Sequence, residues 1–181
     1  MLRVRLVRGP EVELDGEAVA PPRSRRAWTL LAWLALHPGA NPRAQVAAAL
    51  WPDVIDESAR ASLRSAVWAL RRALGPEGDR YLSVTRDALE LSGAWVDVHE
   101  AERLAAADVE GALDLADGEL LPGIEADWAL RAADEHRERL IGWLEALAVA
   151  AEPVAAVRLT RRQAALDPLG EEVHRRLMER L

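Results

Sequence analysis

The chain has 181 residues, of which half are hydrophobic and none is cysteine. This length allows one large domain or two small ones with a buried core, and the lack of cysteine excludes disulfides, cysteine-ligated zinc and thiol catalysis. The first five residues, Met-Leu-Arg-Val-Arg, are unlike a signal peptide, and no run approaches the ~18 apolar residues of a membrane span. We therefore expect a cytoplasmic protein without membrane association.

The net charge of -7 conceals a difference between the two halves of the chain. Residues 1–94 hold 13 arginines and 11 acidic residues, whereas residues 95–181 hold 10 arginines and 19 acidic residues. Such a difference indicates two domains with different partners, which we place at residues 1–93 and 95–181. All the basic residues are arginines, and the planar guanidinium fork suits bidentate contacts with phosphate and guanine.

The first domain is predicted to begin with a small sheet. Leu2–Val7 and Glu11–Leu14 alternate polar and apolar residues on either side of Gly9-Pro10, a pattern typical of a hairpin. Asp15-Gly16 gives a second turn towards Val19. Pro21-Pro22 then ends the sheet region.

Three helices are predicted next. The first runs from Ser24, its N-cap, to His37, and its inward face is Trp28, Leu31, Leu34 and Ala35, which Trp33 and Leu30 broaden. In the second, Asn41 is the cap and Pro42 the first helical residue, and the helix ends near Trp51. The third spans Asp56 to Leu74, with an apolar stripe made of Ala59, Leu63, Val67, Leu70 and Leu74.

A second hairpin, Tyr81–Thr85 and Ala88–Leu91 around Arg86-Asp87, is predicted after the helices. Strands, three helices and a hairpin in this order are typical of a winged helix-turn-helix. After Ser92-Gly93-Ala94 the pattern is helical, with helices over Val98–Ala107, Glu110–Asp117 and Ala126–Ala151, one from Pro153, and one ending at Leu181. The predicted fold is mostly α with small β: a winged helix-turn-helix followed by a tetratricopeptide-like all-α domain.

The third helix carries the candidate DNA-binding residues. Opposite its apolar stripe, at ~100° per residue, lie Trp68, Arg72, Ala61 and Ser65. Its two flanks hold Arg64 and Arg71, and Ser62 and Ala69. In a major groove, arginine and serine bind bases or phosphates, and apolar atoms meet thymine methyl groups. The alternative is an ordinary amphipathic helix whose arginines are solvated, and the pattern of this helix taken alone favours it. The position of the helix after a short helix and before a hairpin favours DNA binding instead.

Further arginines are candidate backbone contacts. Arg23, Arg25 and Arg26 precede or begin the first helix, where an anion is favoured, although solvated charges explain them equally well. Arg60 begins the third helix and is a candidate phosphate contact. Arg86 lies at the predicted hairpin tip, where either a DNA contact or an ordinary polar turn residue fits.

The sequence does not favour an enzyme. The four histidines are far apart and lack metal-binding spacing, and the acidic residues are explained as solvated helix faces. No glycine-rich phosphate loop or calcium loop is present, so we predict no catalytic residue, metal or cofactor.

The run Ala49-Leu-Trp-Pro-Asp53 followed by Ser58–Gly75 resembles the Streptomyces antibiotic regulatory protein family. The second half is similar to the bacterial transcriptional activator domain of that family at Asp117–Gly123, Asp127-Trp128 and Leu166–Glu172. The resemblance implies an OmpR-like winged helix that binds direct repeats near promoters, and an activator that contacts RNA polymerase through its sigma subunit. By position, Ser62, Ser65, Trp68, Ala69 and Arg72 would contact bases and Arg86 would act from the wing.

The sequence departs from the family pattern in two places. Family members continue past Leu177-Met178, so the activator domain is expected to be truncated, either trimmed or an unusually short form. The wing lacks the glycine-rich turn common in OmpR-like proteins, which weakens the assignment of Arg86.

The predicted partners are double-stranded DNA and RNA polymerase, with dimeric or tandem binding to repeated half-sites. A second hypothesis is a regulatory adaptor whose winged helix does not bind DNA specifically and whose acidic helical half binds a protein. A third is a small ligand held near Trp128 and Trp143, for which burial of both rings in the core is the favoured alternative.

Overall fold

The computed structural model describes residues 1–20 and 24–180, so the predictions for Pro21-Pro22 and Arg23 lie outside the described residues. The strands are β1 (Leu2–Arg5), β2 (Glu11–Leu14), β3 (Glu17–Ala18), β4 (Asn41–Pro42), β5 (Leu82–Val84), β6 (Ala88–Leu91) and β7 (Trp95–Val96). The helices are α1 (Arg25–Leu36), α2 (Arg43–Leu50), α3 (Asp56–Leu74), α4 (Asp97–Ala105), α5 (Val109–Ala116), α6 (Asp127–Ala150), α7 (Pro153–Leu166) and α8 (Glu171–Arg180), with a short 3-10 helix η1 (Pro76–Arg80). Within the described ranges no helix combines the length and the apolar character that crossing a membrane requires.

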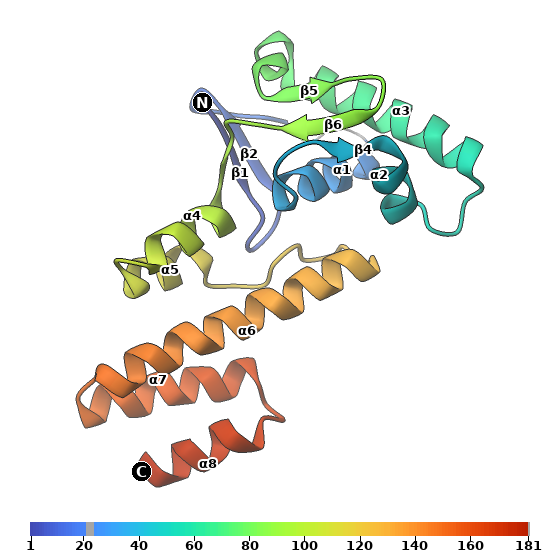
Figure 1. The fold of residues 1–181 in the computed structure, drawn as a ribbon. Coiled ribbons are helices and arrows are strands. Elements are labelled where there is room, and N and C mark those ends of the chain that lie inside the picture. The colour runs from blue at the N-terminus through green and yellow to red at the C-terminus, as the bar shows by residue number, and fades with distance from the viewer. Residues whose placement is uncertain (21–23, 181) are drawn as a thin grey trace.

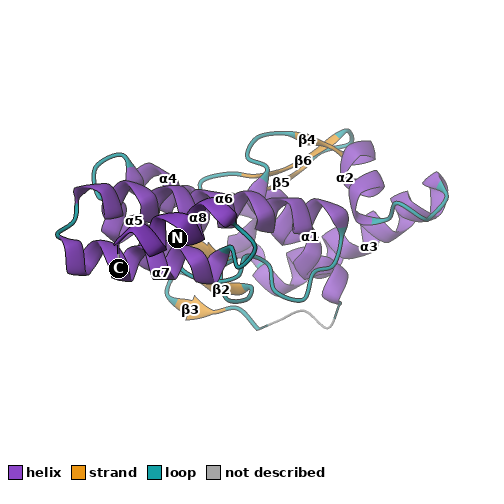
Figure 2. Ribbon diagram, turned by 90° about the horizontal axis from the view of Figure 1, so that it is seen from below, coloured by secondary structure: helices purple, strands orange, loops and turns teal. Residues whose placement is uncertain are grey.

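The structure is mostly helical with two small sheets, as the sequence predicts. One sheet has the order β3-β2-β1-β7, and the other has the order β4-β6-β5. In Figures 1 and 2, α3 and the β5–β6 hairpin lie at one end of the molecule, and α7 and α8 lie at the other. Both predicted hairpins are confirmed, because β1 pairs with β2 and β5 pairs with β6 in antiparallel register.

The helices α1, α2 and α3 pack over a shared apolar core. The bounds of α3 agree with the prediction, and its stripe is buried because residues three or four apart share one face of a helix. In α1 the predicted face is confirmed, because Leu30, Leu31, Trp33, Leu34 and Ala35 are all buried. Trp28 is half-buried and packs against the same core, and Ala27 and Ala32 complete the buried face.

The prediction that Asn41 and Pro42 begin the second helix is wrong. They form β4, which pairs with β6, and α2 begins at Arg43. The Asn41 amide donates to the carbonyl oxygens of His37 and Gly39, and its oxygen accepts from Trp33 Nε1 at 3.3 Å. Because the side chain is buried and fully engaged in this turn, it is not available to cap the helix.

The two halves of the chain share part of their core. β7, which the sequence analysis did not identify, runs parallel to β1. Asp97 is the first residue of α4, and its side chain accepts from the backbone N–H groups of Leu6 and Val7, at 2.8 and 3.0 Å. Burial raises the pKa of the Asp97 carboxyl, while these hydrogen bonds oppose the rise. The division at residues 93–95 stays a prediction, and the core packing runs across it.

The loop between α5 and α6 and the first turn of α6 complete this shared core. Leu121 N–H donates to the Leu6 carbonyl at 2.9 Å, and Val7 forms a β-bridge with Leu120. Trp128 is buried against Trp33, with the ring centroids 5.2 Å apart and the planes nearly perpendicular. The prediction that Trp128 is a core residue is confirmed, whereas Trp143 is half-buried against the second apolar cluster.

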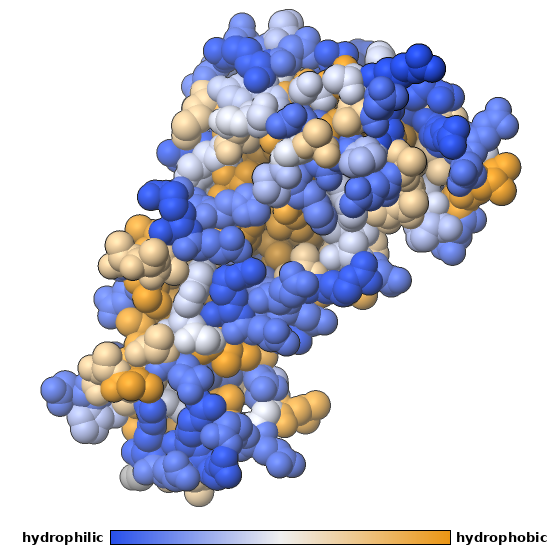
Figure 3. Space-filling model, viewed as in Figure 1, coloured by the Kyte–Doolittle hydropathy of each residue, from blue (hydrophilic) through white to orange (hydrophobic). Residues whose placement is uncertain are grey.

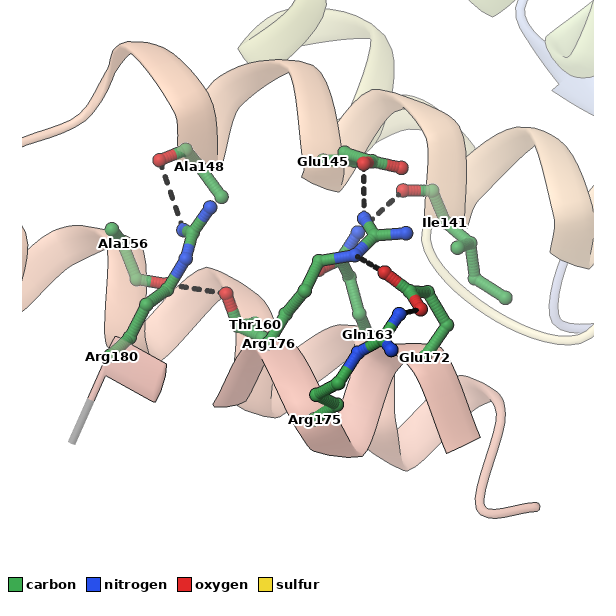
Figure 4. A network of polar contacts seen from close by, with 10 residues as sticks. All are labelled: Ile141, Glu145, Ala148, Ala156, Thr160, Gln163, Glu172, Arg175, Arg176 and Arg180. Carbon is green, nitrogen blue, oxygen red and sulfur yellow. Dashed lines mark hydrogen bonds and ion pairs between the residues drawn. The ribbon is translucent and has the colours of Figure 1, made fainter. Parts of the chain in front are cut away.

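The helices α6, α7 and α8 pack side by side through apolar and polar contacts (Figure 4). Gln163 is buried and donates to the Ile141 carbonyl at 3.0 Å. Arg176 on α8 reaches both Glu145 on α6 and Glu172 on its own helix, and Arg180 donates to the Ala148 carbonyl at 3.1 Å. These contacts hold α8, in which Val173 is buried, against α6.

Candidate nucleic-acid interface

The outward face of α3 holds the predicted base-contacting residues. Trp68 is 63% exposed although it is the largest side chain of the helix. The Arg72 guanidinium carbon lies 5.3 Å from the centroid of the Trp68 ring, close enough for a cation–π contact. Ser65 is exposed, and its hydroxyl donates to the Ala61 carbonyl at 3.2 Å, which leaves its oxygen lone pairs free to accept. This face therefore offers an aromatic ring, a guanidinium and a hydroxyl to a ligand.

The flanks of α3 differ in accessibility. Arg64 and Arg71 are exposed, whereas Ser62 and Ala69 on the other flank are half-buried. Arg71 is paired with Asp79 of η1 at 3.0 Å, so this interaction must break or be shared before Arg71 contacts DNA. Among the described residues, Arg64 forms no ion pair.

A cleft of about 590 Å³ separates α3 from the β5–β6 hairpin. We call it the α3–hairpin cleft, and it is lined by Arg43, Ala44, Arg60, Leu63, Arg64, Thr85, Arg86 and Asp87. Four of these eight residues are arginines that come from α2, α3 and the hairpin turn, and Asp87 is the single acidic residue among them. Guanidinium groups around a concave surface are suited to phosphate oxygens.

The hairpin tip is fixed to α2 and by its own side chains. Arg43 N–H donates to the Asp87 carbonyl at 2.9 Å, and the Arg43 guanidinium lies 3.4 Å from the Thr85 carbonyl. Thr85 Oγ1 donates to the Ala88 carbonyl at 3.1 Å and accepts from the Ala88 N–H at 3.0 Å. These bonds form the turn without glycine, and Arg86 in this turn lines the α3–hairpin cleft.

Several predicted contacts lie outside the cleft. Arg25 and Arg26, both exposed at the start of α1, do not line it, and Arg26 lies over the Trp51 ring at 5.9 Å. Arg60 lines the cleft and pairs weakly with Asp56 at 3.7 Å. Arg43 is the residue that the sequence analysis missed. The signal was present, because Arg43 follows Asn41-Pro42 at a predicted helix start, the same position that made Arg25 and Arg26 candidates.

A metal centre has no support among residues 1–20 and 24–180, where no three His, Asp or Glu side chains cluster suitably. The described geometry is thus a mostly helical fold that presents an aromatic and arginine-rich helix face beside an arginine-lined cleft. It is a candidate surface for a polyanion.

Comparison with known proteins places this fold. No protein-family model matches the chain, and no curated protein matches it. A solved structure of Mycobacterium tuberculosis EmbR, in complex with a low-affinity phosphopeptide, is similar with a TM-score of 0.71 and 19% sequence identity. The alignment covers 99% of this chain and 54% of EmbR, so the chain spans about half the length of that protein. The chain therefore shares the fold of EmbR over nearly its whole length.

Proposed function

We propose that this chain is a sequence-specific DNA-binding transcriptional regulator of the Streptomyces antibiotic regulatory protein type. Residues 1–93 are the OmpR-like winged helix, with α3 as recognition helix and the β5–β6 hairpin as wing, and the helices after them are the tetratricopeptide-like activator domain. The observation that carries the proposal is the outward face of α3 beside the α3–hairpin cleft. The fold shared with EmbR supports it. The proposed activity is binding, without catalysis.

The contacts divide into two kinds. Trp68, Arg72 and Ser65 project from the helix that would enter the major groove, where they would read base edges. Arg43, Arg60, Arg64 and Arg86 surround the cleft beside it, where the phosphate backbone of one strand would lie. One monomer supplies few contacts, so we propose that specific binding requires two copies on a direct repeat.

Replacement of Arg72 or Trp68 by alanine is expected to weaken specific binding about tenfold or more, because a good base contact is worth about 1–3 kcal/mol. Both side chains are exposed, so the variants should unfold at the same urea concentration as the parent protein. Arg161→Ala is the matched control for Arg72→Ala, since Arg161 is exposed on α7 and its loss changes the net charge equally. Mobility shifts with sites selected from random DNA measure the effect, and unchanged affinity in both variants would exclude this face.

Replacement of Arg64 by alanine tests the phosphate assignment separately. Each phosphate neutralised contributes about 0.9 to the slope of log Kobs against log salt. We expect Arg64→Ala to lower the magnitude of this slope by about that amount. It should also weaken binding to the selected site and to random duplexes by the same factor. A change confined to one base position of the selected site would instead make Arg64 a base contact.

Polymerase contact is the second part of the proposal. The loop between α2 and α3 exposes Ile55 at 76% and Val54 at 39%, and apolar atoms mark this edge in Figure 3. Exposed apolar side chains next to the acidic residues Asp53 and Asp56 are suited to a protein partner. In transcription with purified RNA polymerase, DNA-bound protein should raise the yield of the target transcript. DNA occupancy without such an increase would argue against activation.

A regulatory adaptor is the competing function, and it is favoured by the acidic composition of residues 95–181. An adaptor with a non-specific winged helix would recover no enriched sequence from random DNA. The DNA-binding regulator should recover a spaced direct repeat, so one selection experiment with the whole chain separates the two functions.

A further inference from the structure

A second cleft, of about 250 Å³, lies where α1, α4 and α6 meet. It shares no lining residue with the α3–hairpin cleft. Trp33 and Trp128, each 6% exposed, contribute their edge-to-face pair to its wall. His37 stacks on Trp33 with centroids 3.9 Å apart and an interplanar angle of 18°. Aromatic walls of this kind are suited to a planar ring.

One side of this cleft has hydrogen-bond donors without partners. Trp128 Nε1 is buried and has no acceptor among the described residues, whereas nearly all buried N–H groups in proteins are paired. Arg131 also lines the cleft and forms no ion pair within the described part of the chain. The two residues are three positions apart on α6 and so lie on the same helix face. A carboxylate bound in the cleft would pair with Arg131, whereas Trp128 Nε1 is covered by neighbouring atoms and is not open to the cleft.

The other side of the cleft offers acceptors. His37 Nδ1 lies 2.8 Å from the Trp33 carbonyl oxygen, and His99 Nε2 lies 2.8 Å from the Ala35 carbonyl oxygen. A carbonyl oxygen only accepts, so these nitrogens carry the ring protons in the neutral imidazoles. His37 Nε2 is then left as an acceptor, whereas His99 Nδ1 lies 3.9 Å from the Glu102 carboxylate, which also lines the cleft. Glu135, one turn beyond Arg131, adds a carboxylate to the rim.

We propose that this cleft binds a small aromatic carboxylate that also carries a ring hydroxyl. The ring would lie against the tryptophan and histidine walls, and the carboxylate would pair with Arg131. The hydroxyl would donate to His37 Nε2. Such a ligand contacts α1 of the first half and α4 and α6 of the second, so it joins the two halves and acts as an effector. The site does not depend on DNA binding.

The test uses 4-hydroxybenzoate as the probe and the whole chain as the protein. For a ligand of this size we expect a dissociation constant of about 1 mM or below, measured by calorimetry. Binding to the folded state alone also raises the melting temperature as the probe concentration rises. Cyclohexanecarboxylate, which lacks the planar ring and the hydroxyl, should bind at least tenfold more weakly.

Arg131→Ala is the diagnostic variant, because Arg131 is exposed and its removal leaves the aromatic walls in place. Arg137→Ala is its control on the same helix, since Arg137 is exposed and does not line the cleft. We expect binding to weaken at least tenfold in Arg131→Ala and to be unchanged in Arg137→Ala. No binding of the probe to the parent protein at 10 times the expected dissociation constant, about 10 mM, or equal binding to both variants, overturns the proposal.

Discussion

At the scale of single residues, Asp97 shows how one carboxylate fixes the start of the second half. Its Oδ2 accepts from the N–H groups of Leu6 and Val7, and its Oδ1 accepts from that of Val98. Because all three donors and the carboxylate are buried together, removing the acceptor leaves the donors without partners.

We expect Asp97→Ala to lower the free energy of unfolding by about 3 kcal/mol, since each buried donor left unpaired costs about 1–3 kcal/mol. Asp97→Asn keeps an oxygen for Leu6 and Val7 but places an amide against the Val98 N–H, so its cost should be smaller. Urea unfolding at neutral pH measures both. An alanine variant as stable as the parent would show that water satisfies these donors.

The same carboxyl predicts a pH effect of known sign. Burial raises its folded pKa above the ordinary value of 3.8, so the part of the stability that depends on its protonation is complete below 3.8 and is lost as the pH rises through the folded pKa, whereas the ionised carboxylate still accepts its hydrogen bonds. Asp97→Asn should remove this component of the pH dependence.

The sequence pattern predicted which residues of α3 are exposed better than it predicted which residues individual side chains contact. The exposure of Trp68 follows from helical periodicity, because it lies opposite the apolar stripe. The pairing of Arg71 with Asp79 depends on η1, which no periodicity indicated. The prediction that Asn41 caps a helix was wrong for the same reason. Its side chain accepts from Trp33 and its backbone pairs with β6, and no periodicity indicated these contacts.

At the scale of elements, two glycines differ in backbone conformation, one with a positive φ at a helix end and one inside a helix. Gly75 ends α3 with a φ of +66°, in the left-handed region where a side chain is strained. Gly142 lies exposed inside α6, where an added Cβ meets no atom within 4 Å. Gly75 directly follows the predicted end of the third helix at Leu74, and its conformation agrees with a helix end.

We expect Gly75→Ala to destabilise the protein by about 1 kcal/mol, because it forces alanine into a left-handed conformation. Gly142→Ala should stabilise it by about 0.5–1 kcal/mol, because alanine reduces the entropy of the unfolded chain. Thermal unfolding measures both effects, and each variant serves as the control for the other. Equal shifts of the same sign would contradict the backbone assignment at Gly75.

At the scale of the whole molecule, the shared core makes the first half depend on the second. The core around α1 includes Val96, Leu120, Leu121 and Trp128, all beyond residue 94. β7 also covers the edge of β1. Loss of a buried tryptophan alone costs about 3–5 kcal/mol, a large part of the stability of a domain.

A fragment of residues 1–94 should therefore lack a cooperative unfolding transition, whereas residues 1–134, which retain the first turns of α6, should keep one. Near-ultraviolet circular dichroism and urea unfolding distinguish them. Cooperative unfolding of residues 1–94 with the stability of the longer fragment would show that the first half folds independently.

The sequence by itself determined the order of the two hairpins and the helices, the bounds of α3 and the outward position of Trp68 and Arg72, because periodicity and helix-ending residues act locally. Only the tertiary structure brought Arg43 and Arg86 beside Arg60 and Arg64, since this cleft requires β4 to pair with β6 across more than 40 residues. It also decided that α6 completes the core of the first half. Non-local packing and strand pairing leave no periodic signal in the sequence, and for this reason the helix face was predictable and the cleft beside it was not.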